Sequence, residues 1–436
     1  MLFSSGSRAA APGVRALADL TIRDIRCFLT RHLVVVKVET SEPELYGLGC
    51  ATFTYRATAI AAVVHDYLRP FLVGKDPSQI EDIWQSCMVA AYWRNGPVLN
   101  NALSGIDMAL WDIKGKVAGM PLYELFGGRS REAAAVYLVP GGRDLQEFDD
   151  NLNRMVDEGC RHFKINGLQS ILEPDMSRHA PISLTRKIPT VDPTSGYLQK
   201  HMGRIEDSRR LVRVIEAAFD TFRTRFGPEL NALYDVHERL PPMDGLALAK
   251  RLEKYDPYFI EDLLAPEDND YYRILRQQTS VPIAMGELYN HPHEIVPMIK
   301  DRLLDFLRLH LSQVGGLTPA RKLTSLCEPF GIRTAWHGPG DVSPVGHAAN
   351  LMLDLHAWNF GIQEAAPLYR PDSILSDMFP GMPQVREGHM WSNDGPGLGI
   401  EFDETLAVKH PTPAPDAAAM GAMGNVRRPD GTVIRP

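Results

Sequence analysis

Three apolar strands that each end in an acidic residue constrain the fold of this chain more than any other feature. Asp235, Glu261 and Glu287 follow these strands at equal intervals of 26 residues. One strand, one helix and two loops fill such an interval. Successive strands of a (β/α)8 barrel lie side by side, and their carboxyl ends share one rim. The spacing therefore predicts that the three acids converge at the rim of a parallel barrel.

These three acids have the chemistry of a metal site. Converging carboxylates repel one another, and a hard divalent cation relieves that repulsion. Mg²⁺ is held by a few carboxylates together with water and substrate oxygens. A single acid of this kind is more often a solvated loop residue or a helix cap, but three at equal spacing favour a metal site. We therefore predict that Asp235, Glu261 and Glu287 bind Mg²⁺.

Charge and composition exclude several classes of partner. The 436-residue chain has a net charge of −8, which gives no electrostatic basis for binding nucleic acid and disfavours an anionic membrane surface. A small anionic substrate remains compatible, because a metal ion and a few Arg or His residues can outweigh the mean charge locally. The five cysteines are scattered, residues 1–18 lack the apolar core of a signal peptide, and no apolar run reaches transmembrane length. A cytoplasmic protein is expected.

The hydrophobic period divides the chain into three parts. Residues 1–128 combine strand-like and helical stretches and end at a glycine pair, which predicts an α+β capping domain. Strand and helix alternate through residues 129–407, where eight strand candidates predict a (β/α) barrel of the α/β class. Residues 167–203 interrupt this rhythm without a clear period, and we expect them to form a lid over the acidic rim. Residues 408–436 are expected to form an exposed C-terminal extension.

Histidine and lysine side chains at strand ends are candidates for proton transfer. His237 lies two residues after Asp235, and the near-neutral pKa of histidine suits an acid or base; a structural histidine is the alternative. His337 ends a later strand and precedes Gly and Pro residues, which let the backbone approach a ligand closely. Lys164, near the end of the second barrel strand, is either a desolvated general base or a charge partner for a substrate carboxylate.

Further polar residues at this rim are candidates for binding a substrate. Arg308 and His310 share a strand parity, so both could point inward, where an anionic substrate or one of the acids would pair with the arginine. Asp341 could orient His337, bind a hydroxyl or cap the following helix. Glu364, at the end of the eighth strand, could accept hydrogen bonds from a hydroxyl-rich substrate.

Six stretches between about Leu20 and Ala407 together resemble one known family. They are Ile80-Glu81-Asp82-Ile83-Trp84, Tyr92 through Pro97, Ile106 through Lys116, Asp235-Val236-His237, Gly286-Glu287, and His337-Gly338 through Asp341. They resemble the enolase superfamily and, more narrowly, its mannonate dehydratase subgroup, whose members are often labelled starvation-sensing proteins. The resemblance implies an enolase-like modified (β/α)8 barrel with an N-terminal α+β capping domain, and a homo-oligomer.

The resemblance also implies an activity and residue roles. The expected reaction is the Mg²⁺-dependent dehydration of an aldonic acid to a 2-keto-3-deoxy acid. Asp235, Glu261 and Glu287 would hold the ion, and His237 would be the general acid. The acid sugar would be contacted by four residues, His337, Arg308, Asp341 and Glu364.

The chain departs from the subgroup where the proton is abstracted. Lys164 stands at the position of a family arginine, and residues 168–195 contain no tyrosine to complete the abstracting pair. Activity on mannonate itself is therefore doubtful, and Lys164 or His337 is the expected replacement base. Two alternatives stay open. One is a racemase or epimerase that uses these two residues as bases on opposite faces, and the other is a metal-bound protein that binds a sugar acid without turnover.

Overall fold

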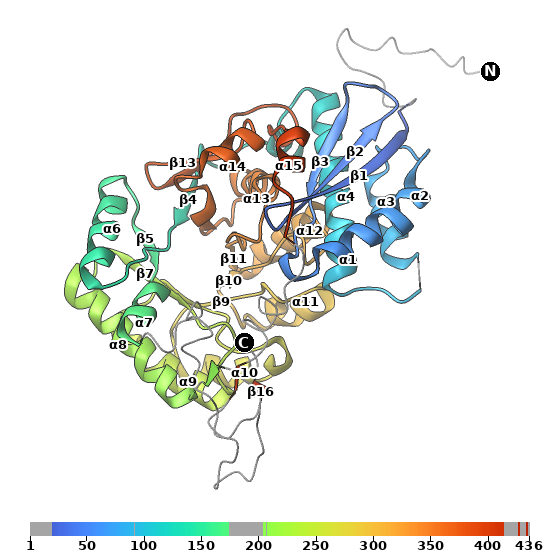
Figure 1. The fold of residues 1–436 in the computed structure, drawn as a ribbon. Coiled ribbons are helices and arrows are strands. Elements are labelled where there is room, and N and C mark those ends of the chain that lie inside the picture. Colours follow the sequence, from blue (N-terminus) through green and yellow to red (C-terminus); the bar gives the residue numbers. More distant parts are fainter. Residues whose placement is uncertain are drawn as a thin grey trace, which may run out of the picture.

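The computed structural model describes residues 20–90, 92–173, 204–205, 207–413, 426–427 and 433–434. Figure 1 shows a small sheet with its helices, coloured blue to cyan, lying against one side of a larger barrel. Most of the predicted lid and most of the predicted C-terminal extension lie outside the described residues. Within the described part of the chain, no helix is both long and apolar enough to cross a membrane.

The N-terminal part is an antiparallel sheet backed by helices. Its strands are β1 (Ile22–Thr30), β2 (Leu33–Thr40) and β3 (Tyr46–Cys50), in the order β1-β2-β3. The helices are α1 (Ala57–Ala62), the π-helical η3 (Val63–Leu68), α2 (Arg69–Leu72), α3 (Ile80–Val89), α4 (Pro97–Ala118) and α5 (Leu122–Phe126). This is the α+β layer that the sequence predicts.

Glycines on β3 let the backbone of α4 come unusually close to the sheet. A Cβ atom on Gly49 would lie 1.9 Å from the carbonyl oxygen of Gly105, and one on Gly47 would lie 1.9 Å from that of Ala109. No residue with a side chain fits such an approach. The two glycines therefore fix the distance between β3 and α4.

The central part of the chain is a parallel eight-stranded barrel, which confirms the predicted fold class. Six strands form one parallel sheet in the order β11-β10-β9-β8-β7-β5, and β12 pairs in parallel with β4. Single bridges close the ring, Leu138 with Phe163 and Thr334 with Phe360. The strands are β4 (Ala134–Tyr137), β5 (His162–Lys164), β7 (Asn231–Asp235), β8 (Phe259–Glu261), β9 (Ile283–Met285), β10 (Phe306–Leu307), β11 (Arg333–Thr334) and β12 (Gln363–Glu364).

Amphipathic helices surround this barrel. Two of them begin at an aspartate whose side chain accepts backbone N–H bonds, Asp144 before α6 and Asp207 before α8. The helix α8 buries one apolar stripe, which includes Leu211, Ile215 and Phe219. The helices are α6 (Leu145–Asp157), α8 (Ser208–Phe226), α9 (Pro242–Leu252), α10 (Tyr271–Gln278), α11 (Pro292–Lys300), α12 (Leu317–Cys327) and α13 (Pro344–His356).

The C-terminal part adds short elements to both layers. The hairpin β13 (Gln384–Arg386) and β14 (His389–Trp391) pairs antiparallel with β4, so it extends the sheet at that strand. Helix α14 (Ser373–Met378) precedes this hairpin in the chain, and helix α15 (Glu404–Lys409) follows it. A small sheet joins β6 (Arg204–Ile205), β15 (Val426–Arg427) and β16 (Val433–Ile434).

The start of the predicted lid is helical. Residues 167–203 show no clear period in the sequence, but helix α7 (Asn166–Leu172) includes the first of them and follows β5. Leu168 and Gln169 are buried, so this helix belongs to the barrel layer. The seven-residue helix is too short for a helical period to stand out in the sequence.

Polar contacts join the cap helices to the start of α12. The indole nitrogen of Trp84 donates to the carbonyl oxygen of Gly315 over 2.8 Å. The buried carboxylate of Asp107 accepts hydrogen bonds from the backbone nitrogen of Thr318 (2.9 Å) and from its hydroxyl (2.5 Å). These bonds connect the α+β layer directly to the barrel.

Candidate active site at the barrel mouth

The structure brings the sequence-predicted site residues to one end of the barrel. Each lies at the carboxyl end of a barrel strand or in the loop that follows it, because parallel strands end at one rim. Most are buried, whereas the Glu287, His237 and Asp341 side chains remain 16%, 17% and 41% exposed. The residues are Lys164, Asp235, His237, Glu261, Glu287, Arg308, His337, Asp341 and Glu364.

The three predicted metal-binding acids fall into two clusters that share one member. Asp235, Glu261 and Asp262 form the first cluster, and Asp235, His237 and Glu287 form the second, with one ligand atom of each residue within 4.8 Å of the others. Asp262 is a site residue that the sequence interpretation missed. Its position directly after Glu261 was visible, but neighbouring residues of a strand point to opposite faces and gave no reason to expect both at the site.

Arg308 lies between the acids of the two clusters. Its side chain is fully buried, with Nε 2.7 Å from Glu261 Oε1 and Nη1 3.2 Å from Glu287 Oε2. It also pairs with Glu364 and donates to the hydroxyl of Tyr137 over 3.1 Å. Burial would lower the pKa of Arg308, but the surrounding carboxylates outweigh it, so the guanidinium stays charged. The predicted inward orientation of Arg308 is confirmed, and its partners are the acids.

Lys164 contacts two of the acids that Arg308 contacts, Glu261 and Glu364, and also Asp235. Its Nζ lies 2.8 Å from Glu364 Oε1, 3.2 Å from Asp235 Oδ2 and 3.3 Å from Glu261 Oε2. Burial alone would lower the pKa of Lys164, but Glu261 and Glu364 raise it well above its usual value. Lys164 is therefore an ammonium ion held by three carboxylates.

His337 is flanked by two acids. Its Nδ1 lies 2.8 Å from Glu287 Oε2, and its Nε2 lies 3.1 Å from Asp341 Oδ1. Burial opposes charge on the ring, but the two carboxylates raise the pKa of His337 to about 10. The ring of His310 stacks on His337 at 4.8 Å, and burial lowers the pKa of His310 to about 4. The pKa values of the two stacked imidazoles are thus shifted in opposite directions, and Arg308 Nη1 lies 2.6 Å from the Nδ1 of His337.

His237 is held directly against Asp235. Its Nε2 lies 2.7 Å from Asp235 Oδ2, and its backbone nitrogen donates to Asp235 Oδ1 over 3.0 Å. His237 and Glu238 both have left-handed backbones, with φ of 54° and 59°. Non-glycine residues adopt this conformation mainly where neighbouring contacts enforce it. The strained turn points to a constrained position for the imidazole beside Asp235.

The acidic cluster around Asp262 has the donor set of a magnesium site. Asp262 Oδ2 is buried and accepts no hydrogen bond from the residues that the structure describes. Burial, then Glu287 and Glu261, raise the pKa of Asp262 well above its usual value, so its charge lacks full compensation. Carboxylate oxygens are the ligands that Mg²⁺ prefers. These residues therefore fit a hard divalent cation.

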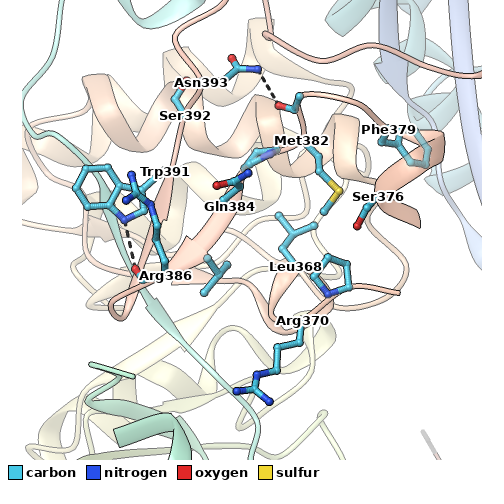
Figure 2. A pocket seen from close by; sticks show the side chains of 14 residues that line it. Leu368, Arg370, Ser376, Phe379, Met382, Gln384, Arg386, Trp391, Ser392 and Asn393 are labelled. Atoms are coloured by element: carbon cyan, nitrogen blue, oxygen red, sulfur yellow. Dashed lines mark hydrogen bonds between the residues drawn. The ribbon is translucent and has the colours of Figure 1, made fainter. Parts of the chain in front are cut away.

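A separate pocket lies on the C-terminal segment. It measures about 560 Å³ and is lined by residues of α14 and the β13–β14 hairpin, as Figure 2 shows. The Arg386 guanidinium lies 4.4 Å from the centre of the Trp391 ring, and Arg370 pairs with Glu158. None of the sequence-predicted site residues lines this pocket. The hollow is therefore distinct from the acidic rim.

Two family models match the chain. Residues 23–127 match the mandelate racemase / muconate lactonizing enzyme N-terminal domain. Residues 147–406 match the enolase C-terminal domain-like family. Together these matches span nearly all of the cap sheet, its helices, and the barrel after β4, and they confirm the predicted superfamily.

Relatives that align over nearly the whole chain extend the match. A D-galactonate dehydratase family member from Salmonella enteritidis is 45% identical over 425 residues, covering 96% of this chain and 100% of the relative. The family member RspA from Pantoea ananatis is also 45% identical over 425 residues, with the same coverage. These names differ from the mannonate dehydratase subgroup of the sequence interpretation, so that narrower assignment stays a prediction.

Solved structures resemble the whole chain. A crystal structure of an enolase from Pantoea ananatis, with bound D-gluconate and Mg, is 43% identical, has a TM-score of 0.84, and covers 96% of this chain and 100% of that chain. A mandelate racemase/muconate lactonizing enzyme from Jannaschia sp. has a TM-score of 0.75 at 22% identity, and the alignment covers 90% of this chain and 98% of that one. The second likeness concerns the fold alone.

Proposed function

Because this chain belongs to the D-galactonate dehydratase family of the enolase superfamily, we propose that it is a Mg²⁺-dependent sugar-acid dehydratase. The substrate would be an aldonic acid and the product a 2-keto-3-deoxy acid. The observation that carries the proposal is the cluster of strand-end acids around Asp235, with His237 against it. The bound D-gluconate and Mg of the Pantoea ananatis structure support the same substrate class.

In this proposal Asp235, Glu261 and Glu287 hold Mg²⁺, with Asp262 next to them. When bound, the ion would stabilise the negative charge that builds on the substrate carboxylate as the C2 proton leaves. Binding would also compensate the acids that Lys164 and Arg308 compensate in its absence.

His237 is the proposed general acid. It would donate its proton to the departing β-hydroxyl group, so that the C–O bond breaks and water leaves. Its Nε2 lies 2.7 Å from Asp235 Oδ2, and this contact holds the imidazole next to the proposed metal site. Tautomerisation of the resulting enol gives the 2-keto-3-deoxy acid.

The proposed bases are Lys164 and His337, and each must lose a proton before it can act. Lys164 has three carboxylate partners, of which Asp235 and Glu261 are proposed metal ligands. His337 has Glu287 and Asp341 as partners. Among the proposed substrate contacts, Asp341 is the most accessible, whereas Arg308 and Glu364 are buried against each other.

Binding of a sugar acid without turnover is the second candidate function. The observation that favours it is that carboxylates surround both candidate bases and raise their pKa, which opposes loss of a proton. Epimerisation, which needs two bases, requires both Lys164 and His337 to be deprotonated in turn.

We also propose that the domain limits are 1–128, 129–407 and 408–436, and that the protein forms a homo-oligomer.

A substrate screen tests the proposed function. The purified protein would be incubated with Mg²⁺ and D-gluconate, D-mannonate, D-galactonate and other hexonic and pentonic acids, with detection of 2-keto-3-deoxy acids. Formation of such a product, abolished by a chelator, is the expected result. Solvent deuterium entering C2 with all hydroxyls retained would instead indicate epimerisation. Ligand binding with neither product formation nor deuterium exchange would indicate a protein that binds a sugar acid without turnover.

A further inference from the structure

Helix α7 begins where β5 leaves the barrel sheet, beside the strand that carries Asp235. The backbone ladder between β5 and β7 pairs Lys164 with Leu233, and the nitrogen of Ile165 donates to the Leu233 carbonyl over 2.9 Å. The next residue, Asn166, is already the first residue of α7. The backbone of this chain segment is therefore no longer available to pair with Asp235.

The side chain of Asn166 continues the ladder that the backbone leaves. Its Nδ2 donates to the carbonyl oxygen of Asp235 over 2.8 Å, and its Oδ1 accepts from the nitrogen of Asp235 over 3.0 Å. A carboxamide offers the same donor and acceptor as a peptide group, so it can replace one residue of a neighbouring strand. Both backbone groups of the buried Asp235 are satisfied in this way.

Gln169, one turn further along α7, contacts both sides of the same segment. Its Oε1 accepts a hydrogen bond from the Tyr234 hydroxyl and another, over 3.4 Å, from Arg239 Nη2. Arg239 in turn donates from Nε to the carbonyl oxygen of Val236 over 3.0 Å. The left-handed turn at His237 therefore lies between two segments that one helix holds.

We propose that Asn166 and Gln169 are positioning residues that hold Asp235 and His237 in place from α7. This inference rests on the proposed function, because it assigns the two contacts to the metal ligand and the general acid. Asn166 fixes the backbone of Asp235, which sets where its carboxylate points. Gln169 fixes the two ends of the turn, which sets where the His237 imidazole lies. Backbone strain at a functional residue persists only where surrounding contacts over-determine it.

The first measurement is Mg²⁺ affinity by calorimetry for the full chain and for Asn166→Ala. Residues behind a metal ligand change metal affinity or activity by about 10–100-fold when they are removed. We expect a loss of that size for Asn166→Ala. The matched control is Asn151→Ala, which removes an amide that donates over 2.7 Å to the Gly141 carbonyl on the exposed side of α6. The control should bind Mg²⁺ like the parent chain.

The second measurement separates the two positioning residues. Gln169→Met keeps Asn166 and should leave Mg²⁺ affinity unchanged while lowering kcat and shifting the pH dependence of kcat. Faster hydrogen exchange in the peptide that spans residues 231–240 is expected for both variants and not for Asn151→Ala. If Asn166→Ala does not fold, Asn166→Asp, which keeps the acceptor and loses the donor, takes its place.

Unchanged Mg²⁺ affinity in a folded Asn166 variant, or equal losses in the Asn151→Ala control, would overturn the inference. An unchanged kcat and pH profile in Gln169→Met would remove the role of Gln169. A failure of the proposed function gives a different result, because the parent chain itself would then catalyse no dehydration. The calorimetric comparison of Mg²⁺ affinities would still test the role of Asn166.

Discussion

At the scale of single residues, the barrel mouth is a problem of charge compensation. Lys164 and Arg308 are buried cations that each contact more than one carboxylate. The desolvation of such groups is offset only when their partners are present. A divalent ion that binds the acids therefore competes with both cations, and the stability of the metal-free protein depends on them.

Lys164→Met should destabilise the metal-free protein and increase its response to Mg²⁺. Asp235, Glu261 and Glu364 would lose a shared cation, and breaking a buried ion pair costs about 3–5 kcal/mol. Saturating Mg²⁺ should restore more stability to the variant than to the parent chain, because the ion replaces the missing charge. Thermal unfolding with and without Mg²⁺ measures both effects.

The control for this experiment is Lys250→Met, which removes an exposed lysine whose Nζ lies 3.3 Å from Gln278 Oε1. It should change unfolding little in either condition. A Lys164→Met protein as stable as the parent chain without metal would contradict the compensation described above.

His237→Asn should stop dehydration while leaving the fold intact. A positioned general acid contributes about 10²–10⁴-fold to a rate, so product formation should fall by about that factor. Exchange of the C2 proton with solvent deuterium should continue, because another residue abstracts that proton. Product assays and mass spectrometry of recovered substrate measure the two steps. Dehydration at the parental rate would remove His237 from the role of acid.

Sequence alone predicted which acids reach the rim, but not how they divide among partners. Equal spacing placed Asp235, Glu261 and Glu287 at strand ends, since strand, helix and loop lengths repeat. The pairing of Arg308 with three different acids depends on side-chain directions across the barrel. Asp262 joins the cluster because its backbone is left-handed, with φ of 41°. No residue type in this part of the sequence predicts that conformation.

At the scale of elements, strands were easier to predict than the connections between them. Short apolar runs that alternate with helical stretches predicted the barrel strands, although several of the observed strands are only two or three residues long. The helix α7 was missed because its stability comes from tertiary contacts at Asn166 and Gln169. Propensity within seven residues cannot report such contacts.

Gly49→Ala tests the contact between β3 and α4. The added methyl group would meet the Gly105 carbonyl oxygen at 1.9 Å, so the helix and sheet must separate. Overpacking of this kind costs about 1–3 kcal/mol and occasionally more. Urea unfolding should show at least that loss. Gly141→Ala, where an added Cβ would meet nothing within 4 Å, is the control. Equal stability of the two variants would contradict the close approach.

At the scale of the whole molecule, buried neutral histidines make stability depend on pH. His347 is fully buried, and neither ring nitrogen has a hydrogen-bond partner among the described residues. Burial lowers the pKa of His347 to about 4, from 6.5. Between these values the unfolded chain binds the proton and the folded chain does not, so stability is lost as pH falls from 6.5 towards 4.

His347→Leu should reduce that loss. The difference in pKa corresponds to about 3 kcal/mol, which is present in full above pH 6.5 and lost below pH 4. Urea unfolding of the parent chain and the variant at several pH values gives the two slopes. The variant should lose less stability over this interval. Parallel slopes would mean that His347 is protonated in the folded protein.

The hydrogen bonds of Trp84 and Asp107 with the start of α12 determine how a ligand can enter and leave. If the cap domain rotated away from the barrel as a rigid body, these hydrogen bonds would break. The Asp107 carboxyl group would become exposed, and its pKa, which burial raises to about 7, would fall. The cap is therefore expected to stay seated through a turnover cycle. Entry and release of ligand at the barrel mouth then depend on movements of single loops and side chains. Small-angle scattering should therefore give the same radius of gyration with and without ligand.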